Sequence, residues 1–468
     1  MSWQAAADAF LWFVFLYVLA HTLSYLMLNW SAWRAMRRHQ GSLLAEGGAP
    51  VLSGIEPAIS LIVPAFNEEQ TIVSTVRSAM QLAYPDVEIL VVNDGSRDGT
   101  LQALVREFAL APFPQAIRVQ LATERVRGVF RSPRHPNLRV IDKENGGKAD
   151  AINAGINVAR HPLVCVVDAD SILMRDSLLR VVQPFVHQPH TVACGGTVRI
   201  ANGCRVESGL MTEIGLPRAL LPMFQVVEYL RAFLFGRMGW SPSNALLIIS
   251  GAFGVMRRTV VVECGGYLRD TIGEDMELVV RMHRLLKAEG REYRITFVPD
   301  PIIWTEAPED LRTLRNQRSR WQRGLSESLW KNRGLLFSRR GGAAGWLAFP
   351  FFLLFEWLSP AVELTGYLVT ATFVVLDQVD WVVAAWFMAA CLAFGLFLSM
   401  VALLLEELGY RLYRNPADLP RLFATVLLEN LGYRQLNAWF RLEGMAKWLT
   451  GRRAAWGAMK RSGNWQGR

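Results

Sequence analysis

Residues 163–170 read Leu163-Val164-Cys165-Val166-Val167-Asp168-Ala169-Asp170, an apolar run that ends in two carboxylates. Consecutive apolar residues over this length are typical of a strand buried on both faces of a sheet. Because side chains alternate along an extended chain, Asp168 and Asp170 should point to the same side of the strand end. Two oxygen donors so placed can hold a divalent cation, Mg²⁺ or Mn²⁺, shared with substrate phosphates. A D-x-D triplet is common, so this interpretation depends on its place at a strand end.

Three more apolar runs precede this one, and stretches with helical periodicity separate them. The predicted strands are 59–63, 88–92, 138–141 and 163–167, and the predicted helices are 71–82, 100–108 and 148–160. Strands that alternate with helices predict an α/β domain with a parallel sheet covered on both faces. Each predicted strand ends in a polar cluster, which is where such sheets bind their ligands.

The composition indicates membrane segments before this domain and after it. The chain has 468 residues, of which 51% are hydrophobic. Residues 10–30 are nearly all apolar and long enough to cross a bilayer. No Lys or Arg precedes them, which disfavours a cleavable signal, and three arginines follow them. By the positive-inside rule the N-terminus is outside and the α/β domain is cytoplasmic.

The last third of the chain contains further apolar stretches. Residues 346–376 include Pro360, so they form either one kinked span or an interfacial piece followed by a span. Residues 382–405 form another span. Residues 419–468 mix apolar with basic residues, which predicts an amphipathic cytoplasmic helix, with a third span within 419–449 as the alternative. The expected parts are a membrane helix (1–40), a cytoplasmic catalytic domain (56–335), membrane helices (343–410) and a basic interfacial tail (415–468). A multi-pass protein of a bacterial-type plasma membrane is therefore expected.

Charge and cysteine content narrow the partners. The net charge is +9, which has three ordinary causes: nucleic acid, anionic lipid or an anionic substrate. No zinc-finger or basic-zipper pattern is present, so we expect the bilayer and a diphosphate substrate as partners and no nucleic acid. The five cysteines form no CxxC pair, which predicts free buried thiols rather than disulfides or a zinc site.

Polar clusters after the other strands are candidates for binding a nucleotide. Ala65 and Glu68 follow the first strand and can face a planar ligand, although an ordinary helix N-cap has the same sequence. Asp94 lies before a Gly-rich turn and can accept hydrogen bonds from a base or ribose, but turn chemistry favours the same residues. Lys148 follows two glycines at a predicted helix start, which suits a phosphate. No Ser or Thr follows Lys148, so the loop is not a Walker A motif.

Two later motifs carry further polar candidates. Glu274 and Asp275 open an amphipathic helix over 276–286, where a carboxylate also suits the helix dipole. The functional interpretation makes Asp275 a general base that removes a proton from an acceptor hydroxyl. In the basic segment 317–321, Arg320 can pair with a diphosphate and Trp321 can stack on a sugar. A basic helix that lies on anionic headgroups is the alternative for this segment.

Taken in order, these motifs resemble the series of the family-two glycosyltransferases, which is D, DxD, (T)ED and Q(Q/R)xRW. The chain carries it as Asp94, Asp168-Ala169-Asp170, Glu274-Asp275 and Gln317-Arg318-Ser319-Arg320-Trp321. The resemblance covers residues 59 to about 323 and extends to the flanking spans of the processive branch: cellulose, hyaluronan, chitin and poly-N-acetylglucosamine synthases. The compact plan looks most like the poly-β-1,6-N-acetylglucosamine synthases. Gly273 departs from the pattern, because many relatives have Thr there.

The resemblance implies a GT-A fold and inverting transfer from UDP-N-acetylglucosamine or UDP-glucose to a glycan. It assigns the metal to Asp168 and Asp170, and the base to Asp275. The implied donor-binding residues are Ala65, Glu68, Asp94, Lys148, Asp168, Asp170, Gln317, Arg320 and Trp321. The implied acceptor-binding residues are Gly251, Ala252, Phe253, Glu274 and Trp321. Residues 210–240 look like the family's interfacial helix, and a small accessory membrane subunit is compatible with this plan.

Two other functions stay open. One is a single-step transferase that acts on a membrane lipid, and the other is an inactive scaffold with a transferase fold. Within 346–376, Glu356 and Glu363 lie seven positions apart and thus on one helical face. Ionisable residues at membrane depth usually face an aqueous path, so we predict a path for the nascent glycan. The alternative is an interfacial segment in which Glu356 is simply hydrated.

Overall fold

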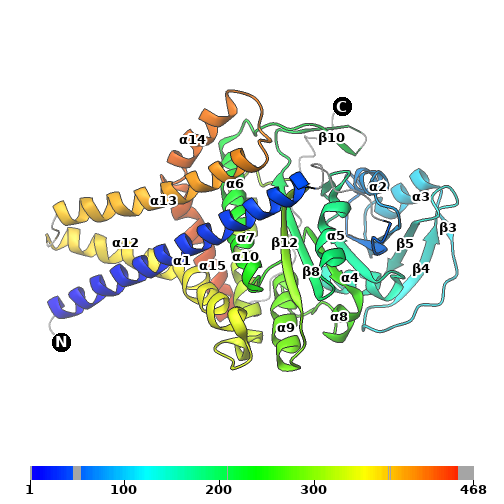
Figure 1. Ribbon diagram of the computed structural model, residues 1–468, viewed down its shortest axis with the longest axis horizontal. Helices are drawn as coiled ribbons and strands as arrows, with labels where there is room; N and C mark the ends of the chain where they lie inside the picture. The colour runs from blue at the N-terminus through cyan, green and yellow to red at the C-terminus, as the bar shows by residue number, and fades with distance from the viewer. Residues whose placement is uncertain (1–2, 46–53, 208, 378, 380, 452–468) are drawn as a thin grey trace.

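The computed structural model describes residues 3–45, 54–207, 209–377, 379 and 381–451, which form an α/β domain beside a group of long helices (Figure 1). The domain is built on a ten-stranded sheet with the order β3-β4-β5-β2-β1-β6-β11-β8-β12-β7. Its strands are β1 (Ile59–Ala65), β2 (Val87–Asp94), β3 (Ala111–Pro112), β4 (Val126–Arg131), β5 (Leu138–Lys143), β6 (Leu163–Val167), β7 (Ile172–Leu173), β8 (Thr191–Ile200), β11 (Phe253–Arg257) and β12 (Arg294–Thr305). A separate hairpin pairs β9 (Arg205–Glu207) with β10 (Leu210–Glu213).

The centre of the sheet has the predicted parallel arrangement. Strands β5, β2, β1 and β6 are neighbours and run parallel, with Ile62 opposite both Leu90 and Val166. Outside this centre the sheet is mixed: β12 runs parallel to β8, but β4 is antiparallel to β5, and β11 is antiparallel to both β6 and β8. The prediction of a parallel sheet is therefore wrong for β4 and β11. Antiparallel neighbours need no helical crossover. The alternation of strands and helices in the sequence therefore predicts only the parallel strands at the centre.

The expected α/β fold is confirmed, and helices pack on the sheet as the apolar strands require. The helices of the domain are α2 (Ile72–Met80), α3 (Thr100–Phe108), α4 (Lys148–Val158), α5 (Ser177–His187), α8 (Arg258–Glu263), α9 (Glu274–Ala288) and α10 (Leu311–Lys331). Helix α4 approaches β1 closely, since a Cβ on Gly155 would lie 2.5 Å from the Ile62 side chain. This approach fixes the start of α4 next to the carboxyl ends of the central strands.

A second group of helices lies beside the domain. It contains α1 (Trp3–Ala45), α6 (Leu220–Leu230), α7 (Met238–Trp240), α11 (Phe349–Phe351), α12 (Ser359–Val375), α13 (Trp381–Gly409), α14 (Asp418–Leu428) and α15 (Tyr433–Leu449). Short 3-10 and π segments complete it: η1 (Arg231–Arg237), η2 (Ser241–Ser243), η3 (Arg333–Leu335), η4 (Ala344–Ala348) and η5 (Phe352–Trp357). Figure 1 shows α1, α12 and α13 projecting from the domain as three long rods.

Within the described residues, three helical stretches are long and apolar enough to cross a membrane. They are Trp12–Ser42, Ala344–Val375 and Ala384–Gly409. Helix α15 has 17 residues and is not among them. The described part of the tail thus contains no helix that fits the alternative of a third C-terminal span. The expected tail extends to residue 468, and its part 452–468 lies outside the described residues.

The apolar stretch around Pro360 bends at Leu358. The Leu358 N–H still bonds to the Leu353 carbonyl at 3.1 Å, and Pro360 lies in the first turn of α12, where its missing N–H is tolerated. In Figure 1 the yellow segment before α12 turns toward the domain, whereas α12 runs beside α1 and α13. The expected helix over 210–240 is wrong at its start, because Leu210–Glu213 pairs with β9 and the helix begins at Leu220.

The acidic residues of the apolar stretch have partners in the structure. Glu356 accepts a hydrogen bond of 2.9 Å from the Tyr25 hydroxyl, and its other oxygen lies 3.4 Å from an Arg441 nitrogen of α15. Glu363 accepts a hydrogen bond of 2.7 Å from Tyr367. These contacts tie the segment before α12 to α1 and α15, and the glycan path stays a prediction.

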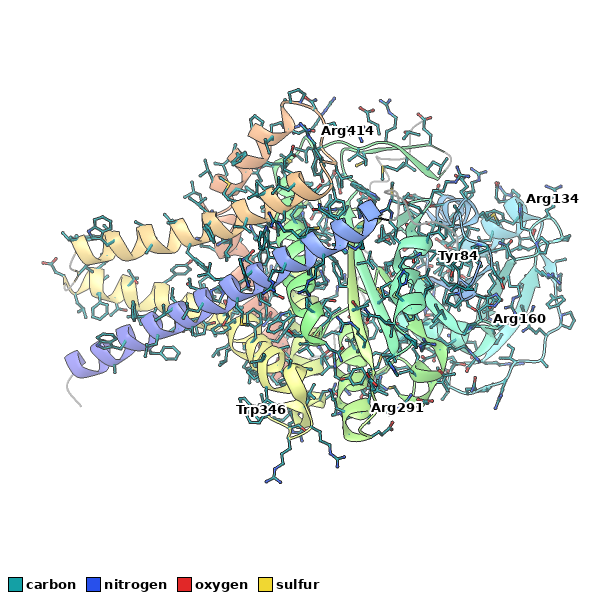
Figure 2. All side chains as sticks on the ribbon, viewed as in Figure 1. Tyr84, Arg134, Arg160, Arg291, Trp346 and Arg414 are labelled. Carbon is teal, nitrogen blue, oxygen red and sulfur yellow. The ribbon has the colours of Figure 1, made fainter. Side chains whose placement is uncertain are left out.

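Exposed arginines lie on several sides of the molecule, and the cysteines of the domain are buried. Arg134, Arg160, Arg291 and Arg414 are exposed. Figure 2 places Arg134 and Arg160 at the end of the sheet farthest from the long helices, and Arg291 and Arg414 on opposite edges, while Trp346 lies on the yellow segment before α12. The cysteines of the domain are free and buried, as predicted: Cys165, Cys194, Cys204 and Cys264.

Candidate active site

Four of the predicted site residues meet where α4, β6 and α9 end or begin. Lys148 is the first residue of α4, and its Nζ lies 2.6 Å from Asp168 Oδ1 and 3.7 Å from Glu274 Oε1. The same Nζ donates a 3.3 Å hydrogen bond to the Gly251 carbonyl. Asp168 follows β6, and Glu274 opens α9. The fold therefore gathers a cation and several carboxylates from segments far apart in the sequence.

The Asp275 carboxylate is held in one orientation by backbone donors. Its Oδ2 accepts a 2.7 Å hydrogen bond from the Gly251 N–H, and its Oδ1 accepts a 2.8 Å bond from the Met276 N–H. Each carboxylate oxygen has a second acceptor site, so the group can still receive a hydroxyl proton. Asp275 is partly buried, next to the turn that precedes β11.

Burial and neighbouring charges set the protonation of this cluster. Burial alone would lower the pKa of Lys148, but the Asp168 and Glu274 carboxylates raise its pKa, so the ammonium stays charged. Burial raises the pKa of Glu274 to about 7, which Lys148 opposes and Asp275 reinforces. Glu274 therefore takes up a proton near neutral pH, and the repulsion among the carboxylates is reduced.

Asp94 is the last residue of β2, and its carboxylate is surrounded by donors from the protein itself. Lys143 Nζ lies 2.6 Å from Oδ1, and the Gly146 and Gly147 N–H groups donate bonds of 3.0 and 2.8 Å. Asn145 Nδ2 donates a further bond of 3.1 Å. The side chain is only 4% exposed. Asp94 thus fixes the loop before α4, and its predicted contact with the nucleoside stays a prediction.

The loop conformation and the buried cation below it support each other. Gly147 has a φ of 91°, which favours glycine, and this conformation turns its N–H toward Asp94. Lys143 is fully buried and also lies 2.6 Å from Asp150. The lysine therefore neutralises two buried carboxylates and holds the start of α4, which carries Lys148.

The Asp168-Ala169-Asp170 segment forms a turn between β6 and β7. The Ser171 N–H bonds to the Asp168 carbonyl at 3.1 Å, and the Thr75 hydroxyl bonds to the Ala169 carbonyl at 2.6 Å. The Asp168 side chain is 30% exposed, whereas Asp170 is 7% exposed. The described residues contain no cluster of three or more His, Cys, Asp or Glu side chains suited to a metal. Two carboxylates that leave the remaining positions to phosphate and water fit Mg²⁺ or Mn²⁺.

Helix α10 presents the residues of the Q-x-x-R-W motif toward this region. Trp321 is 47% exposed, and its ring lies 6.5 Å from that of Tyr229 on α6. Arg318 lies 4.3 Å from the Trp321 ring centre and pairs with Glu228 at 2.8 Å. Gln317 is 7% exposed, and its side-chain carbonyl accepts no hydrogen bond among the described residues. Arg320 is partly buried on the same helix.

Helices α10 and α9 touch where α9 begins. A Cβ on Gly273 would lie 2.8 Å from the Gly324 Cα, and a Cβ on Gly324 would lie 2.8 Å from the Gly273 Cα. Glu327 of α10 also accepts bonds from the Ile272 N–H, at 2.8 Å, and from the Thr271 hydroxyl, at 3.0 Å. Gly273, the departure from the family pattern, therefore allows the contact that sets α10 against Asp275.

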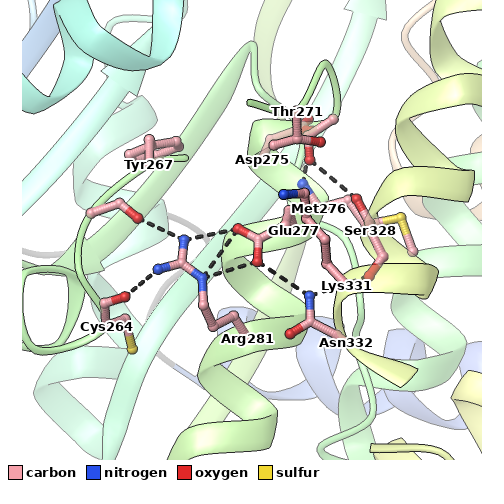
Figure 3. Close-up of polar contacts among 12 residues, drawn as sticks. Cys264, Tyr267, Thr271, Asp275, Met276, Glu277, Arg281, Ser328, Lys331 and Asn332 are labelled. Atoms are coloured by element: carbon pink, nitrogen blue, oxygen red, sulfur yellow. Dashed lines mark hydrogen bonds and ion pairs between the residues drawn. The ribbon is translucent and has the colours of Figure 1, made fainter. Parts of the chain in front are cut away.

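A buried network below Asp275 stabilises the same junction (Figure 3). Arg281 pairs with Glu277 at 2.8 Å and bonds to the Gly266 carbonyl at 2.7 Å. Asn332, directly after α10, donates to Glu277 at 3.2 Å. At the surface, Lys331 pairs with Asp270 at 2.6 Å. Helix α9, the loop before it and α10 are thus fixed as one unit.

The other predicted residues lie around this cluster in different ways. Ala65 ends β1 and is 2% exposed, and Glu68 accepts a 2.6 Å bond from the Thr71 hydroxyl. Ala252 contributes its carbonyl, which accepts the Asp168 N–H at 3.4 Å. Phe253 is fully buried in β11, so its side chain belongs to the core and only its backbone borders the site.

Several residues of the site have no counterpart in the sequence predictions. Lys143 and the contacts of Asp150 were missed, although a lysine at the end of an apolar run is a signal for a buried partner. Tyr229 lies on α6 and Arg237 ends η1, in a segment where no pattern in the sequence marks a binding residue. Only the structure shows that this segment packs against α10, through contacts such as the one between Tyr229 and Trp321.

The geometry agrees with the comparison with known proteins. Residues 57–324 match the model of the family described as glycosyltransferase like family 2, and the chain belongs to this family. It is an enzyme of the glycosyltransferase class, with the α/β GT-A fold that the motifs imply.

Among individual proteins, the chain is similar to poly-β-1,6-N-acetyl-D-glucosamine synthases. It is 28% identical over 277 residues to the protein of Staphylococcus aureus (strain COL), covering 58% of this chain and 56% of the relative. It is 27% identical over 275 residues to the protein of Staphylococcus epidermidis, with the same coverage. The chain thus spans little more than half the length of these relatives.

A solved structure shows the fold over nearly the whole chain. The mannosyltransferase of Pyrobaculum calidifontis, in complex with GDP-Man and Mn²⁺, matches with a TM-score of 0.52 at 18% sequence identity. The match covers 96% of this chain and 100% of that chain. At this identity the likeness concerns the fold, which includes the helices beside the α/β domain.

Proposed function

We propose that this glycosyltransferase moves a sugar from a UDP-sugar to a growing polysaccharide, with inversion at the anomeric carbon. The observation that carries the proposal is the Asp275 carboxylate, oriented by Gly251 and Met276 beside the Lys148–Asp168 pair. A polymer of N-acetylglucosamine is favoured, and a glucose polymer comes next. The first choice rests on the similarity to the staphylococcal synthases.

In the proposed reaction, Asp275 removes the proton from the attacking hydroxyl of the acceptor. A single displacement needs one base on the acceptor side and stabilisation of the leaving diphosphate on the other side. Lys148 lies next to Asp168 and carries the positive charge that the diphosphate requires. Glu274, 3.7 Å from Lys148, keeps this cation in place on the acceptor side.

Asp168 and Asp170 would hold a divalent cation, Mg²⁺ or Mn²⁺, on the donor diphosphate. When bound, the cation neutralises charge on the leaving group. Ala65, Glu68 and Asp94 would form the nucleoside side, where Asp94 acts by holding the loop of Gly146 and Gly147. Gln317, Arg320 and Trp321 would close over the donor and the acceptor end.

We further propose that the catalytic domain (56–335) faces the cytoplasm and that the product leaves through the membrane part. Three helical stretches of suitable length and composition support a multi-pass arrangement (1–40 and 343–410). The tail (415–468) would lie at the interface, where Arg441 of α15 contacts Glu356. Processive extension, with or without a small accessory subunit, follows from the likeness to polymer synthases.

The experiment uses purified full-length protein in detergent with labelled UDP-N-acetylglucosamine or UDP-glucose and Mg²⁺ or Mn²⁺. A high-mass polymer from the wild type, with Asp275→Asn inactive, supports the proposal. A single sugar on extracted lipid supports a lipid glycosyltransferase instead. If no donor is consumed and Asp275→Asn behaves as the wild type does, the chain is an inactive scaffold.

A further inference from the structure

Arg237 is a partly buried cation that takes no part in the proposed reaction. Arg237 ends η1, and its guanidinium lies 3.7 Å from the ring centre of Phe233. Its Nε and Nη1 are buried and make no hydrogen bond within the part of the chain that the structure describes. Burial lowers the pKa of Arg237 to about 10, which the charges of Asp275, Tyr229 and Glu356 partly offset. The guanidinium is therefore charged at neutral pH, and two of its donors lack a hydrogen-bond partner among the described residues.

Other arginines of the same layer are paired. Arg231, also in η1, forms an ion pair with Glu429 and donates a 2.6 Å bond to Ser399. Arg318 pairs with Glu228 at 2.8 Å. Buried donors without a hydrogen-bond partner are unfavourable, so such donors in a folded protein indicate a ligand or a water that completes them. Arg237 thus differs from its neighbours in a way that indicates a binding role.

The surroundings of Arg237 indicate which ligand it meets. Tyr229, Phe233 and Arg237 are spaced four residues apart on one helical face, with the rings of Tyr229 and Phe233 5.7 Å apart. Tyr229 leads to the exposed ring of Trp321, 6.5 Å away. At the other end, the carboxylates that act most on Arg237 are Asp275 and Glu356. These ring contacts form a continuous stripe from Trp321 of the Q-x-x-R-W motif through Tyr229 and Phe233 to Arg237.

Alternating aromatic faces and hydrogen-bond donors suit a sugar ring, whose faces are apolar and whose edges carry oxygens. We propose that Arg237 binds the acceptor: its guanidinium donates hydrogen bonds to oxygens of the terminal sugar of the growing glycan and holds that sugar for attack at Asp275. The Phe233 ring packs against the guanidinium, and the Tyr229 ring packs against Phe233. The inference rests on the proposed function and adds an acceptor-binding residue to it.

The test separates the acceptor from the donor. Inverting transferases also pass the donor sugar to water, a reaction that needs the donor site and the base but no glycan. Purified full-length protein is assayed with UDP-N-acetylglucosamine for hydrolysis, and with added N-acetylglucosamine oligosaccharides for transfer. For Arg237→Gln we expect the acceptor KM to rise about tenfold to a hundredfold, since charge-assisted hydrogen bonds are lost. Hydrolysis and the donor KM should stay within about twofold.

Two further variants make the result specific. Arg237→Lys keeps the charge and should recover part of the acceptor affinity. Arg205→Gln, the same change at an exposed arginine of β9, should alter neither reaction. Arg237→Gln removes the contact with the Phe233 ring but no ion pair, so its Tm should stay close to that of the wild type, whereas loss of an ion-paired structural arginine would lower the Tm clearly.

Three results overturn the inference. These are an unchanged acceptor KM in Arg237→Gln, an equal loss of hydrolysis and transfer, and a lowered Tm that accounts for the loss. If the wild type consumes no UDP-sugar at all, the proposed function fails and this inference fails with it. An active wild type with an unaffected Arg237→Gln variant overturns the inference alone.

Discussion

The contact between Gly273 and Gly324 gives the sharpest structural prediction. An added Cβ on Gly273 would lie 2.8 Å from the Gly324 Cα and 2.9 Å from its carbonyl carbon and oxygen. Carbon atoms pack at about 3.5–4.0 Å, so Gly273→Ala must separate α9 from α10 by roughly 1 Å. Overpacking of this kind costs about 1–3 kcal/mol of folding free energy.

The same displacement should lower activity, because α9 carries Asp275 and α10 carries Trp321. A misplacement of roughly 1 Å between reacting groups can reduce turnover by about a hundredfold. Gly324→Ala tests the contact from the other side. In an open helix Gly→Ala would stabilise the protein by about 1 kcal/mol. At Gly324 the clash with Gly273 should outweigh that gain, so we expect both Tm and turnover to fall.

The assay measures Tm in detergent and turnover of UDP-N-acetylglucosamine. Gly366→Ala in α12 is the matched control, because nothing lies within 4 Å of the position of its Cβ. It should keep wild-type turnover and an equal or higher Tm. If Gly273→Ala and Gly324→Ala also keep wild-type Tm and turnover, the close crossing of α9 and α10 is refuted.

Four further predictions concern other parts of the molecule. Gly444 of α15 packs against the Ser319 backbone of α10, so Gly444→Ala should reduce turnover and Gly444→Val should abolish it, as measured by polymer yield. The raised pKa of Glu274, about 7 against a reference of 4.5, means that the folded protein binds more protons than the unfolded chain between these values. The free energy of unfolding should therefore fall as the pH rises through this window, by up to about 3 kcal/mol, and Glu274→Gln should lose that slope in melts from pH 5 to 8. Chelation with EDTA should abolish transfer, with recovery on Mg²⁺ or Mn²⁺ in the wild type but not in Asp170→Asn. If Glu356→Ala and Glu363→Ala both leave polymer yield and length unchanged, the predicted glycan path is lost.

Much of the fold could be predicted because the central strands and helices are local patterns. The helix over 100–108 and the strand over 163–167 have the predicted bounds. The positions of β4 and β11 could not be predicted, since antiparallel pairing depends on contacts between distant segments. Likewise, Leu210–Glu213 has an apolar start that fits a helix, but pairing with β9 decides its structure.

Part of the site could be predicted, because several of its polar residues follow apolar strands or open a helix. Lys148 lies close to Asp168, Glu274 and the Gly251 carbonyl, which the sequence places on separate segments. The sequence could not reveal which groups of the protein itself pair with the site residues. The internal contacts of Asp94 depend on a loop that follows another strand. The place of Arg237 depends on the packing of the interfacial segment against the catalytic domain.

The most direct test of the central claim is the anomeric configuration of the product. Purified protein is incubated with isotope-labelled UDP-N-acetylglucosamine, whose sugar is α-linked, and the polymer is analysed by nuclear magnetic resonance. A single displacement with Asp275 as the base predicts β-linked sugars throughout and no product from Asp275→Asn. An α-linked product, or a β-linked product from Asp275→Asn at the wild-type rate, would contradict the proposed mechanism.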